Sequence, residues 1–508
     1  MSLLSAFKTG INNIWKCIAV FVIQIFEFMG VDIFLLKRNH IPTEVKRKKY
    51  VRYANINGNF ICLLFLVLLF FSCEKESVNN KVELTFDEKL YALSDLQITE
   101  ITPQNGYPRQ FEIYISQPLD HENPEGTRFN QQIFLSHRDE SAPVVFLPSG
   151  YSARASTICE LSEILNANQI YVSHRFMREA EPDVMEWDYL TVEQAAADFH
   201  CIVQMFKTIY EGKWVSYGAS KNGSTALFHK RFYPDDVDAT LAQVAPISFA
   251  AEDPRYEAFL ENDVDQEICD KIKRFQVELL ENRDGILPFI RNYMDNSSLT
   301  YSIPEGVILE FETLEYYFAF WQYGTEDISA VPDTGNTAEQ LYQFILGEGY
   351  LPYYSDEGIA ILEPFYYQMY TELGYYRLID DHLSHLLVDL PDPSYSYFAP
   401  EGVSLVFNSL TMQDVNNWLQ TGGDNIIYIY GEIDPWTAGA VELTGETNAI
   451  KIIQPGANHL ISLYDLDERD LVYSTLEDWL DLTIEVSEPV LSKSPHHREE
   501  TLRSVRYK

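Results

Sequence analysis

The sequence predicts an α/β fold, a mostly parallel sheet flanked by helices, divided in two by a large helical insertion. Three observations support this class. Between residues 105 and 249, β-rich segments alternate with helical ones, which is the pattern of βα units. From 250 to 404 the alternation stops, and the chain is helical in character and crowded with aromatic residues. Buried strand patterns then return between 405 and 487.

The first part of the core contains both half-exposed and buried strand patterns. Strands are expected at 109–119, 128–138, 142–151, 168–176, 213–219 and 239–249. The first two alternate apolar and polar residues, as antiparallel strands do, whereas the later ones are continuous β-rich runs that suit a buried parallel sheet. An amphipathic helix is expected over 191–210, with Thr191 and Gln194 as its capping box.

The second part of the core supplies two further strands and a closing helix. Segments 425–437 and 449–460 each contain a buried strand and the loop that follows it, and 470–486 has the pattern of a helix. The polar tail from 488 to 508 is expected to be disordered.

The N-terminal segment has the organisation of a secretory signal. A basic stretch at 37–53 precedes twelve apolar residues at 60–71, which are too few to span a bilayer, and Ser72-Cys73 follows. This pattern is typical of a bacterial lipoprotein, with Cys73 as the lipidated first residue; a plain signal peptide is the alternative. We expect the translation start to lie further downstream, exclude residues 1–72 from the fold, and treat 73–104 as a linker.

Composition and charge narrow the possible partners. With 37 Lys and Arg against 76 Asp and Glu, the formal net charge is −39, which argues against nucleic acid as a partner. We expect membrane contact only through the lipid anchor, at the bacterial cell envelope (periplasm or outer membrane). No oligomeric state is indicated.

The three interior cysteines are too widely spaced for a zinc site, and the pair His382 and His385 lacks metal-binding spacing, so no metal or cofactor is predicted.

Three residues follow predicted strands in an informative order: Ser220, Asp434 and His459. Serine, acid and histidine in this chain order are characteristic of the α/β-hydrolase fold, where they gather beyond the carboxyl ends of the strands. A serine hydroxyl needs an imidazole to take its proton, and the imidazole needs a carboxylate to stabilise its charged form. Glu432 is a rival acid, but Asp434 precedes a proline and lies further round the turn.

The turn around the serine departs from the usual spelling G-x-S-x-G. In Gly218-Ala219-Ser220-Lys221-Asn222-Gly223 the second glycine comes one residue late. A side chain at the position two residues after the serine is expected to press on neighbouring strands, which makes Asn222 the doubtful feature of this elbow.

The gap from Ser220 to Asp434 far exceeds the two βα units, of roughly 30 residues each, that a bare sheet needs. We therefore expect the inserted helices to form a lid over the site.

These segments resemble a known family. The quoted motifs are GASKNGSTALFHKRFYPDDVDATLAQVAP, EWDYLTVEQAAADFH, FAFWQYG, YYQMYTELGYY, GEIDPWTAG and PGANH. They are similar to the secreted bacterial prolyl tri- and tetrapeptidyl aminopeptidases, distant relatives of prolyl carboxypeptidase and dipeptidyl peptidase II. The resemblance runs from about residue 105 to 485. It implies a serine peptidase with Ser220, Asp434 and His459 as its triad, which releases short peptides from a free N-terminus, preferably after proline.

The oxyanion hole is expected to use backbone N–H groups of Lys221, directly after the serine, and of Tyr151. The Lys221 amine is not expected to reach Ser220, so an outward or structural role is assigned to it.

An aminopeptidase must also hold the cationic amine of its substrate. Our candidates are Glu372 and Gln368, with Glu179 and Glu181 as rivals, although any of these acids could be an ordinary solvated charge.

The remaining candidates are aromatic, and two other functions stay open. Phe318, Phe320 and Trp321 could wall a proline pocket or simply fill the core of the lid. A catalytic triad determines the type of reaction, acyl transfer, but not whether the substrate is a peptide or an ester. An esterase on the same core is therefore an alternative. A catalytically inactive lipoprotein that binds peptides or glycans is a third.

Overall fold

The computed structural model describes residues 84–324 and 328–485 of the 508-residue chain. The predicted signal segment, Cys73 and the tail from 488 lie outside the described residues. The elements below belong to one compact unit, which extends from Glu83 onward.

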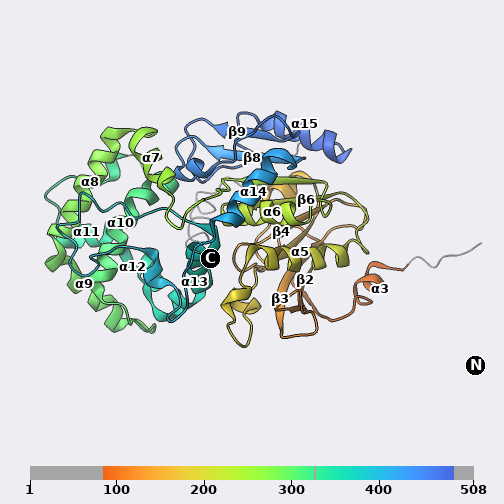
Figure 1. Ribbon diagram of the computed structural model, residues 1–508, viewed down its shortest axis with the longest axis horizontal. Coiled ribbons are helices and arrows are strands. Elements are labelled where there is room, and N and C mark those ends of the chain that lie inside the picture. The colour runs from red at the N-terminus through yellow and green to blue at the C-terminus, as the bar shows by residue number, and fades with distance from the viewer. Residues whose placement is uncertain (1–83, 325–327, 486–508) are drawn as a thin grey trace, which may run out of the picture. The chain divides into compact units, whose positions relative to one another are not determined.

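A nine-stranded sheet runs through the described residues (Figure 1). Its strands in spatial order are β1 (Leu96–Ile101), β2 (Arg109–Pro118), β3 (Arg128–His137), β5 (Asn168–Val172), β4 (Val144–Pro148), β6 (Trp214–Ala219), β7 (Ala239–Gln243), β8 (Ile426–Gly431) and β9 (Ile450–Gln454). The pairs from β1 to β5 are antiparallel, and every pair from β5 to β9 is parallel. The carboxyl ends of β6, β7, β8 and β9 therefore share one edge of the sheet.

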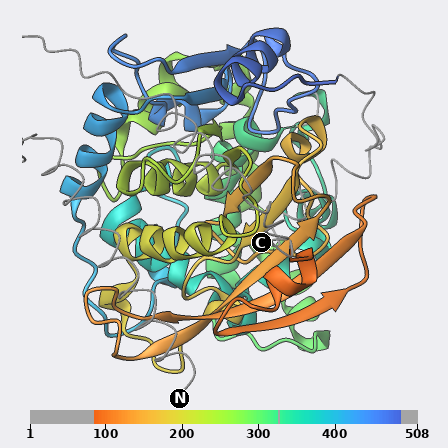
Figure 2. The same cartoon turned by 90° about the vertical axis from the view of Figure 1, so that its right-hand side faces the viewer.

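Helices cover both faces of this sheet (Figure 2). They are α3 (Phe86–Leu90), α4 (Glu160–Ile164), α5 (Val192–Phe206), α6 (Lys221–Phe232), α14 (Ser409–Thr421) and α15 (Arg469–Leu480). Side chains alternate along each strand, so Val145 packs toward α4 and α15, whereas its neighbour Phe146 packs toward α5. The face of β7 and β8 that carries Ala242 and Tyr428 packs against α6 and α14.

The helical insertion consists of α7 (Pro254–Asn262), α8 (Gln266–Glu281), α9 (Arg283–Asn296), α10 (Glu305–Tyr323), α11 (Ala338–Ile345), α12 (Gly347–Tyr350), α13 (Asp356–Gln368) and the π turn η6 (Met369–Leu373). Short 3₁₀ turns are η2 (Arg178–Ala180), η3 (Trp187–Tyr189), η4 (Ile328–Ala330), η5 (Leu351–Tyr354), η7 (Tyr395–Phe398) and η8 (Pro435–Gly439). We call residues 250–404 the lid. Its helices have a core of their own, which Trp436 of η8 joins from the sheet side. Helix α10 is apolar around most of its circumference because it runs through that core.

Several expectations need correction. Part of the predicted linker is folded, since it forms α3 and the edge strand β1. Strand β7 is shorter than expected because Val244, directly after it, turns away with φ +44°. Only half of the capping box on α5 forms: the Thr191 hydroxyl accepts from Gln194 N, but the Gln194 side chain accepts from His121 N instead.

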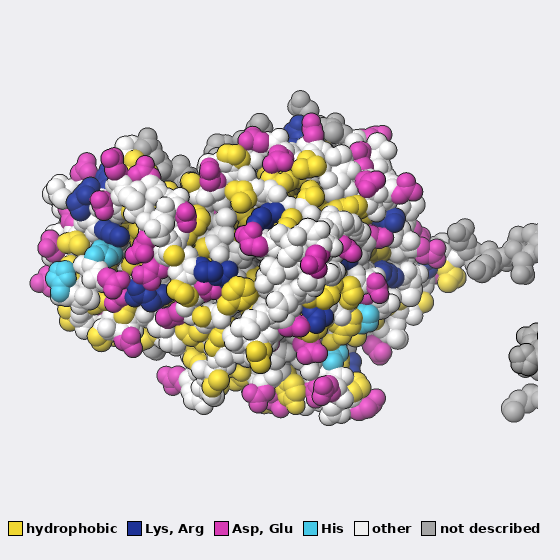
Figure 3. Space-filling view, turned by 45° about the horizontal axis from the view of Figure 1, so that its top comes forward, with side chains coloured by type: hydrophobic (Ala, Val, Ile, Leu, Met, Phe, Trp, Pro, Cys, Tyr) yellow, Lys and Arg dark blue, Asp and Glu magenta, His cyan; other side chains and the backbone are white. Residues whose placement is uncertain are grey.

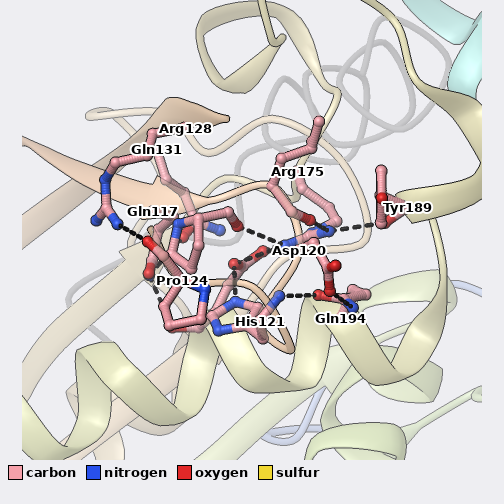
Figure 4. A network of polar contacts seen from close by, with 12 residues as sticks. Gln117, Asp120, His121, Pro124, Arg128, Gln131, Arg175, Tyr189 and Gln194 are labelled. Atoms are coloured by element: carbon pink, nitrogen blue, oxygen red, sulfur yellow. Dashed lines mark hydrogen bonds and ion pairs between the residues drawn. The ribbon is translucent and has the colours of Figure 1, made fainter. Parts of the chain in front are cut away.

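A buried polar network fixes the loop after β5 to helix α5 (Figure 4). Arg175 is fully buried and donates to both carboxylate oxygens of Asp198 at 2.7 and 2.9 Å, as well as to the carbonyls of Leu119 and Tyr189. His121 contacts the same carboxylate at 2.7 Å. Removing one partner of such a buried pair costs about 3–5 kcal/mol, so this loop is held firmly on α5.

Acidic side chains are spread over the surface in Figure 3, with fewer basic ones between them, as the net charge requires. Within the described ranges, no helix is both long and apolar enough to cross a bilayer.

Candidate active site

Ser220 lies on a sharp turn between a strand and a helix. Strand β6 ends at Ala219 and α6 begins at Lys221, with Ser220 between them at φ 58° and ψ −133°. This backbone conformation is strained for a residue other than glycine, and such strain is typical of a nucleophile elbow. The turn is tied to the next strand because Ser220 N donates to the carbonyl of Gln243 at 2.8 Å.

Two glycines let this turn close. A Cβ on Gly218 would lie 2.3 Å from the Asn222 carbonyl carbon, and one on Gly223 would lie 2.8 Å from the Ala245 Cβ. The crowded position is therefore Gly223, three residues after the serine, and not Asn222. The expectation that Asn222 would press on neighbouring strands is wrong, and the late glycine lies where the packing needs it.

Asn222 instead braces the loop after β4. Its Oδ1 accepts from Gly150 N at 2.7 Å and from the Ser149 hydroxyl at 3.3 Å. The Ser149 hydroxyl in turn accepts from Tyr151 N at 2.9 Å. Residues 149–151, the oxyanion loop below, are thus held against the start of α6.

Of the two backbone N–H groups expected to form the oxyanion hole, that of Lys221 has no hydrogen-bond acceptor among the described residues, whereas that of Tyr151 has one. Lys221 N is at the first position of α6, where the helix itself offers no acceptor. The N–H of Tyr151 is taken by Ser149. This is the local turn in which a serine hydroxyl accepts from the N–H two residues later, a signal that Ser149-Gly150-Tyr151 carries in the sequence.

The Lys221 side chain is buried and not outward. Its Nζ donates to the Gly150 carbonyl at 2.6 Å and to Gln368 Oε1 at 2.8 Å, and it lies over the rings of Tyr151 and Phe365. Burial lowers the pKa of Lys221 well below its ordinary value. The lysine after the serine therefore connects the oxyanion loop to the lid.

The acid and the histidine meet at the neighbouring strand ends. Nδ1 of His459, after β9, lies 2.6 Å from Oδ2 of Asp434, after β8. The other oxygen of Asp434 accepts from Trp436 N at 3.1 Å, and both members of the pair are buried. Glu432, the rival acid, is exposed and accepts from Gly456 N. The structure thus brings His459 to Asp434 and not to Glu432.

The lid holds the histidine loop in place. His459 N donates to the carbonyl of Gln322 near the end of α10, and Asn458 donates to the carbonyl of Gly324. The Tyr323 ring meets His459 edge-on at 6.1 Å between centroids. Nε2 of His459 is buried and has no hydrogen-bond partner among the described residues, so it is available for a proton.

The predicted amine-binding residues have other partners. Both oxygens of Glu372 are engaged, one with Val192 N at the start of α5 and the other with the Thr411 hydroxyl. Burial raises the pKa of this carboxyl. Gln368 is buried against Lys221. The rivals Glu179 and Glu181 are exposed on and beside η2.

The predicted proline-pocket aromatics divide into buried and half-buried side chains. Phe318 stacks on Tyr376 at 3.5 Å and meets Trp436 edge-on, deep in the lid core. Trp321 is also buried, whereas Phe320 is half-buried beside it. Phe318 thus serves the lid core, which was the alternative left open by the sequence.

The described residues contain no group of three His, Cys, Asp or Glu side chains that could hold a metal ion. His382 bonds to Gln276 at 2.8 Å, and Cys159, Cys201 and Cys269 are unpaired thiols.

A mostly parallel sheet with a serine elbow after β6, an acid after β8 and a histidine after β9 defines the α/β-hydrolase class. Comparison with known proteins gives the family. Residues 79–484 match the family model of PS-10 peptidase S37, and the chain belongs to this family of serine peptidases.

Two relatives by sequence have names that agree with that family. A prolyl tri/tetrapeptidyl aminopeptidase of Streptomyces mobaraensis is 29% identical over 402 residues, covering 77% of this chain and 84% of the relative. A Caenorhabditis elegans protein named as a serine protease is 21% identical over 430 residues, covering 71% and 84%. Among solved structures, a proline iminopeptidase of Mycobacterium smegmatis matches with 12% identity and a TM-score of 0.36, covering 72% of this chain and 98% of that one.

Proposed function

We propose that this protein is a serine aminopeptidase that releases tri- or tetrapeptides from the free N-terminus of peptides, with proline preferred before the cleaved bond. The observation that carries the proposal is the buried His459–Asp434 pair at the sheet edge that also bears the Ser220 elbow. The name of the Streptomyces relative supports the length released and the preference for proline.

In the proposed mechanism Ser220 Oγ attacks the scissile carbonyl while His459 Nε2 takes its proton. Asp434 holds the imidazole through Nδ1 and stabilises the imidazolium. The N–H of Lys221 donates to the oxyanion. His459 then gives the proton to the leaving amine, and the N-terminal peptide stays esterified to Ser220. Water attacks this ester with His459 as the base, which releases the peptide and regenerates the serine.

A panel of fluorogenic peptides, free and blocked at the N-terminus, tests this function on wild type and Ser220→Ala. We expect the variant to lose about 10⁴-fold or more in kcat, because the nucleophile is removed. Normal cleavage by Ser220→Ala would exclude the triad, and equal rates on free and blocked peptides would exclude an aminopeptidase. Faster turnover of short-chain esters than of peptides would indicate an esterase. No labelling by a fluorophosphonate would indicate an inactive binding protein.

The proposal extends to location. The basic, apolar and Ser72-Cys73 pattern supports export to the bacterial cell envelope and lipidation at Cys73. Mass spectrometry of the mature N-terminus checks this: a diacylglyceryl cysteine is expected, and an unmodified terminus at another residue would contradict it.

A further inference from the structure

A cavity of about 170 Å³ lies between the lid and the loop after β5. The lid lines it with the residue before Thr300, with η5 and with the first half of α13, and the core contributes Arg178 of η2. Arg178 and Glu357 are exposed, so the cavity opens to solvent on their side. Its apolar wall consists of Leu299, Pro352, Ile361 and Leu362. A ligand in this cavity therefore contacts both the lid and the core.

The volume and the wall of the cavity select the kind of group that fits. An apolar cavity of about 150 Å³ stays dry and binds one benzene molecule. The cavity beside α13 is of similar size, so it admits one ring or one branched side chain, whereas a long acyl chain is too large for it. Its apolar wall offers a water molecule few hydrogen-bond partners, which favours an apolar group as the occupant.

Two polar side chains of the lining already have partners within the lid. The Ser355 hydroxyl donates to the Pro352 carbonyl at 2.7 Å and accepts from Gly358 N at 3.0 Å. Glu357 accepts from Thr300 N at 3.1 Å and lies in the first turn of α13, where the positive end of the helix dipole complements its charge. Hydrogen bonds from its own backbone N–H and from that of Thr300 lower the pKa of Glu357. These contacts hold the first turn of α13 against the segment before α10.

The charge without such a partner is the guanidinium of Arg178, which has no hydrogen-bond or ion-pair partner among the described residues. Its backbone has φ 43°, and Phe176, two residues earlier, has φ 67°. Positive φ is strained for side chains of this size and persists only where the surroundings hold it. The loop is held from both sides: the buried network of Figure 4 fixes it to α5, and Phe176 and Ala180 pack with Tyr367 of α13. The fold thus keeps an unpaired cation at the mouth of an apolar cavity.

We propose that this cavity is a second binding site, separate from the catalytic residues, for an apolar carboxylate. The ring or branched side chain of the ligand enters the cavity, and its carboxylate pairs with the Arg178 guanidinium, whose planar fork matches two carboxylate oxygens. Small carboxylic acids and the C-terminal residue of a peptide ending in Leu or Phe share this chemistry. The inference does not depend on the peptidase function proposed above.

Helix α13 connects this site to the oxyanion loop. Gly358 lines the cavity, and Gln368, ten positions later at the end of the helix, accepts from Lys221 Nζ at 2.8 Å. Ten helical residues span about 15 Å along the axis. Phe365 of the same helix meets the Tyr151 ring at 5.4 Å. A ligand that bridges η2 and α13 therefore stabilises the arrangement in which α13 contacts the oxyanion loop.

Isothermal titration calorimetry on the full chain tests the site. All proteins carry Ser220→Ala, so that no probe is cleaved. The probes are 3-phenylpropionate, N-acetyl-Gly-Phe with a free carboxylate, and the neutral amide of each. We expect Arg178→Gln to weaken binding of both carboxylates by about 10- to 100-fold, because a charge-assisted hydrogen bond is lost, and the amides to bind the unsubstituted site equally weakly. Leu362→Trp, which fills the cavity, should abolish binding. Arg274→Gln is the matched control, since Arg274 is an exposed arginine of α8 outside the cavity.

Thermal melts with and without probe test the bridge between lid and core. A saturating carboxylate should raise the melting temperature of the Arg274→Gln control but not that of Leu362→Trp. Tighter binding of the acetylated dipeptide than of 3-phenylpropionate identifies peptide C-termini as the source of the ligand, and the reverse order identifies small carboxylic acids. Amides that bind as tightly as carboxylates, or binding that Arg178→Gln leaves unchanged, would overturn the proposal. Because Arg178 is exposed, its variant keeps the test decisive even if Leu362→Trp fails to fold.

Discussion

Lys221 shows how one side chain can tie the chemistry to the lid. Its ammonium has no carboxylate partner among the described residues, and its donors go to the Gly150 carbonyl and to Gln368. A buried cation without a counter-ion is costly, and burial correspondingly lowers its pKa. Because Gly150 belongs to the oxyanion loop, we infer that Lys221 positions this loop.

Lys221→Met is expected to lower kcat by about 10- to 100-fold with little change in KM. The loop that Lys221 Nζ holds is bonded to the start of α6, where Lys221 N donates to the oxyanion, and misplacing a catalytic donor by about 1 Å has effects of this size. Lys230→Met is the control. Lys230 is another buried lysine of α6, which donates to the carbonyls of Pro234 and Val237, far along the helix from Ser220. Steady-state kinetics and thermal melts of both variants check this. Equal losses of kcat would mean that Lys221 acts only through stability.

At the scale of single residues, chain order was enough to predict the pairing of Asp434 with His459, because each follows a strand that local sequence shows. Strand β8 is buried as expected, whereas β9 has only one buried residue. The partners of Glu372 were not predictable. Its carboxylate meets Val192, 180 positions earlier, and no local pattern records such a contact. The same holds for Asn222, whose side chain bonds to Gly150 across 72 positions.

At the scale of elements, the strands were predicted better than the lid. Strands of the parallel sheet have short, continuous apolar runs with clear ends, such as β8, whose six residues are all buried. Helix α10 is buried on most sides, so its sequence lacks the amphipathic period that would mark its ends and inward face. Which faces of α10 pack against the lid core therefore had to come from the structure.

The edge strand β1 was missed for the opposite reason. It pairs with β2 along its whole length, but no residue of it is buried, and its pattern is one of half-exposed and exposed positions. An edge strand of this kind depends on backbone pairing, which leaves little trace in hydrophobicity.

At the scale of the whole molecule, buried histidines link stability to pH. Burial lowers the pKa of His137, of His174 and of His229. A second cause differs among them: Arg109 lowers it further at His137, Lys221 lowers it further at His174, and the Asp236 carboxylate opposes it at His229. In each case the folded chain binds the proton less readily than the unfolded chain does.

The sign of the pH effect follows from this difference. As pH falls below about 6.5, the unfolded chain takes up protons that the folded chain refuses, so the free energy of unfolding decreases. Each histidine contributes at most about 1.4 kcal/mol per pH unit. Carboxyls whose pKa is raised by burial, such as Glu160 and Glu372, act in the opposite direction, but mainly closer to pH 5.

We therefore expect urea denaturation to show constant stability from pH 8 to 7 and a steep loss from pH 6.5 to 5.5. His137→Gln serves as the comparison because His137, bonded to Tyr210 at the end of β3, takes no part in the proposed catalysis. Since this variant removes one of the histidines whose pKa burial lowers, its curve should fall less steeply than that of wild type while its activity is retained. Equal slopes for wild type and variant, or stability that does not change down to pH 5.5, would show that these histidines do not limit acid stability.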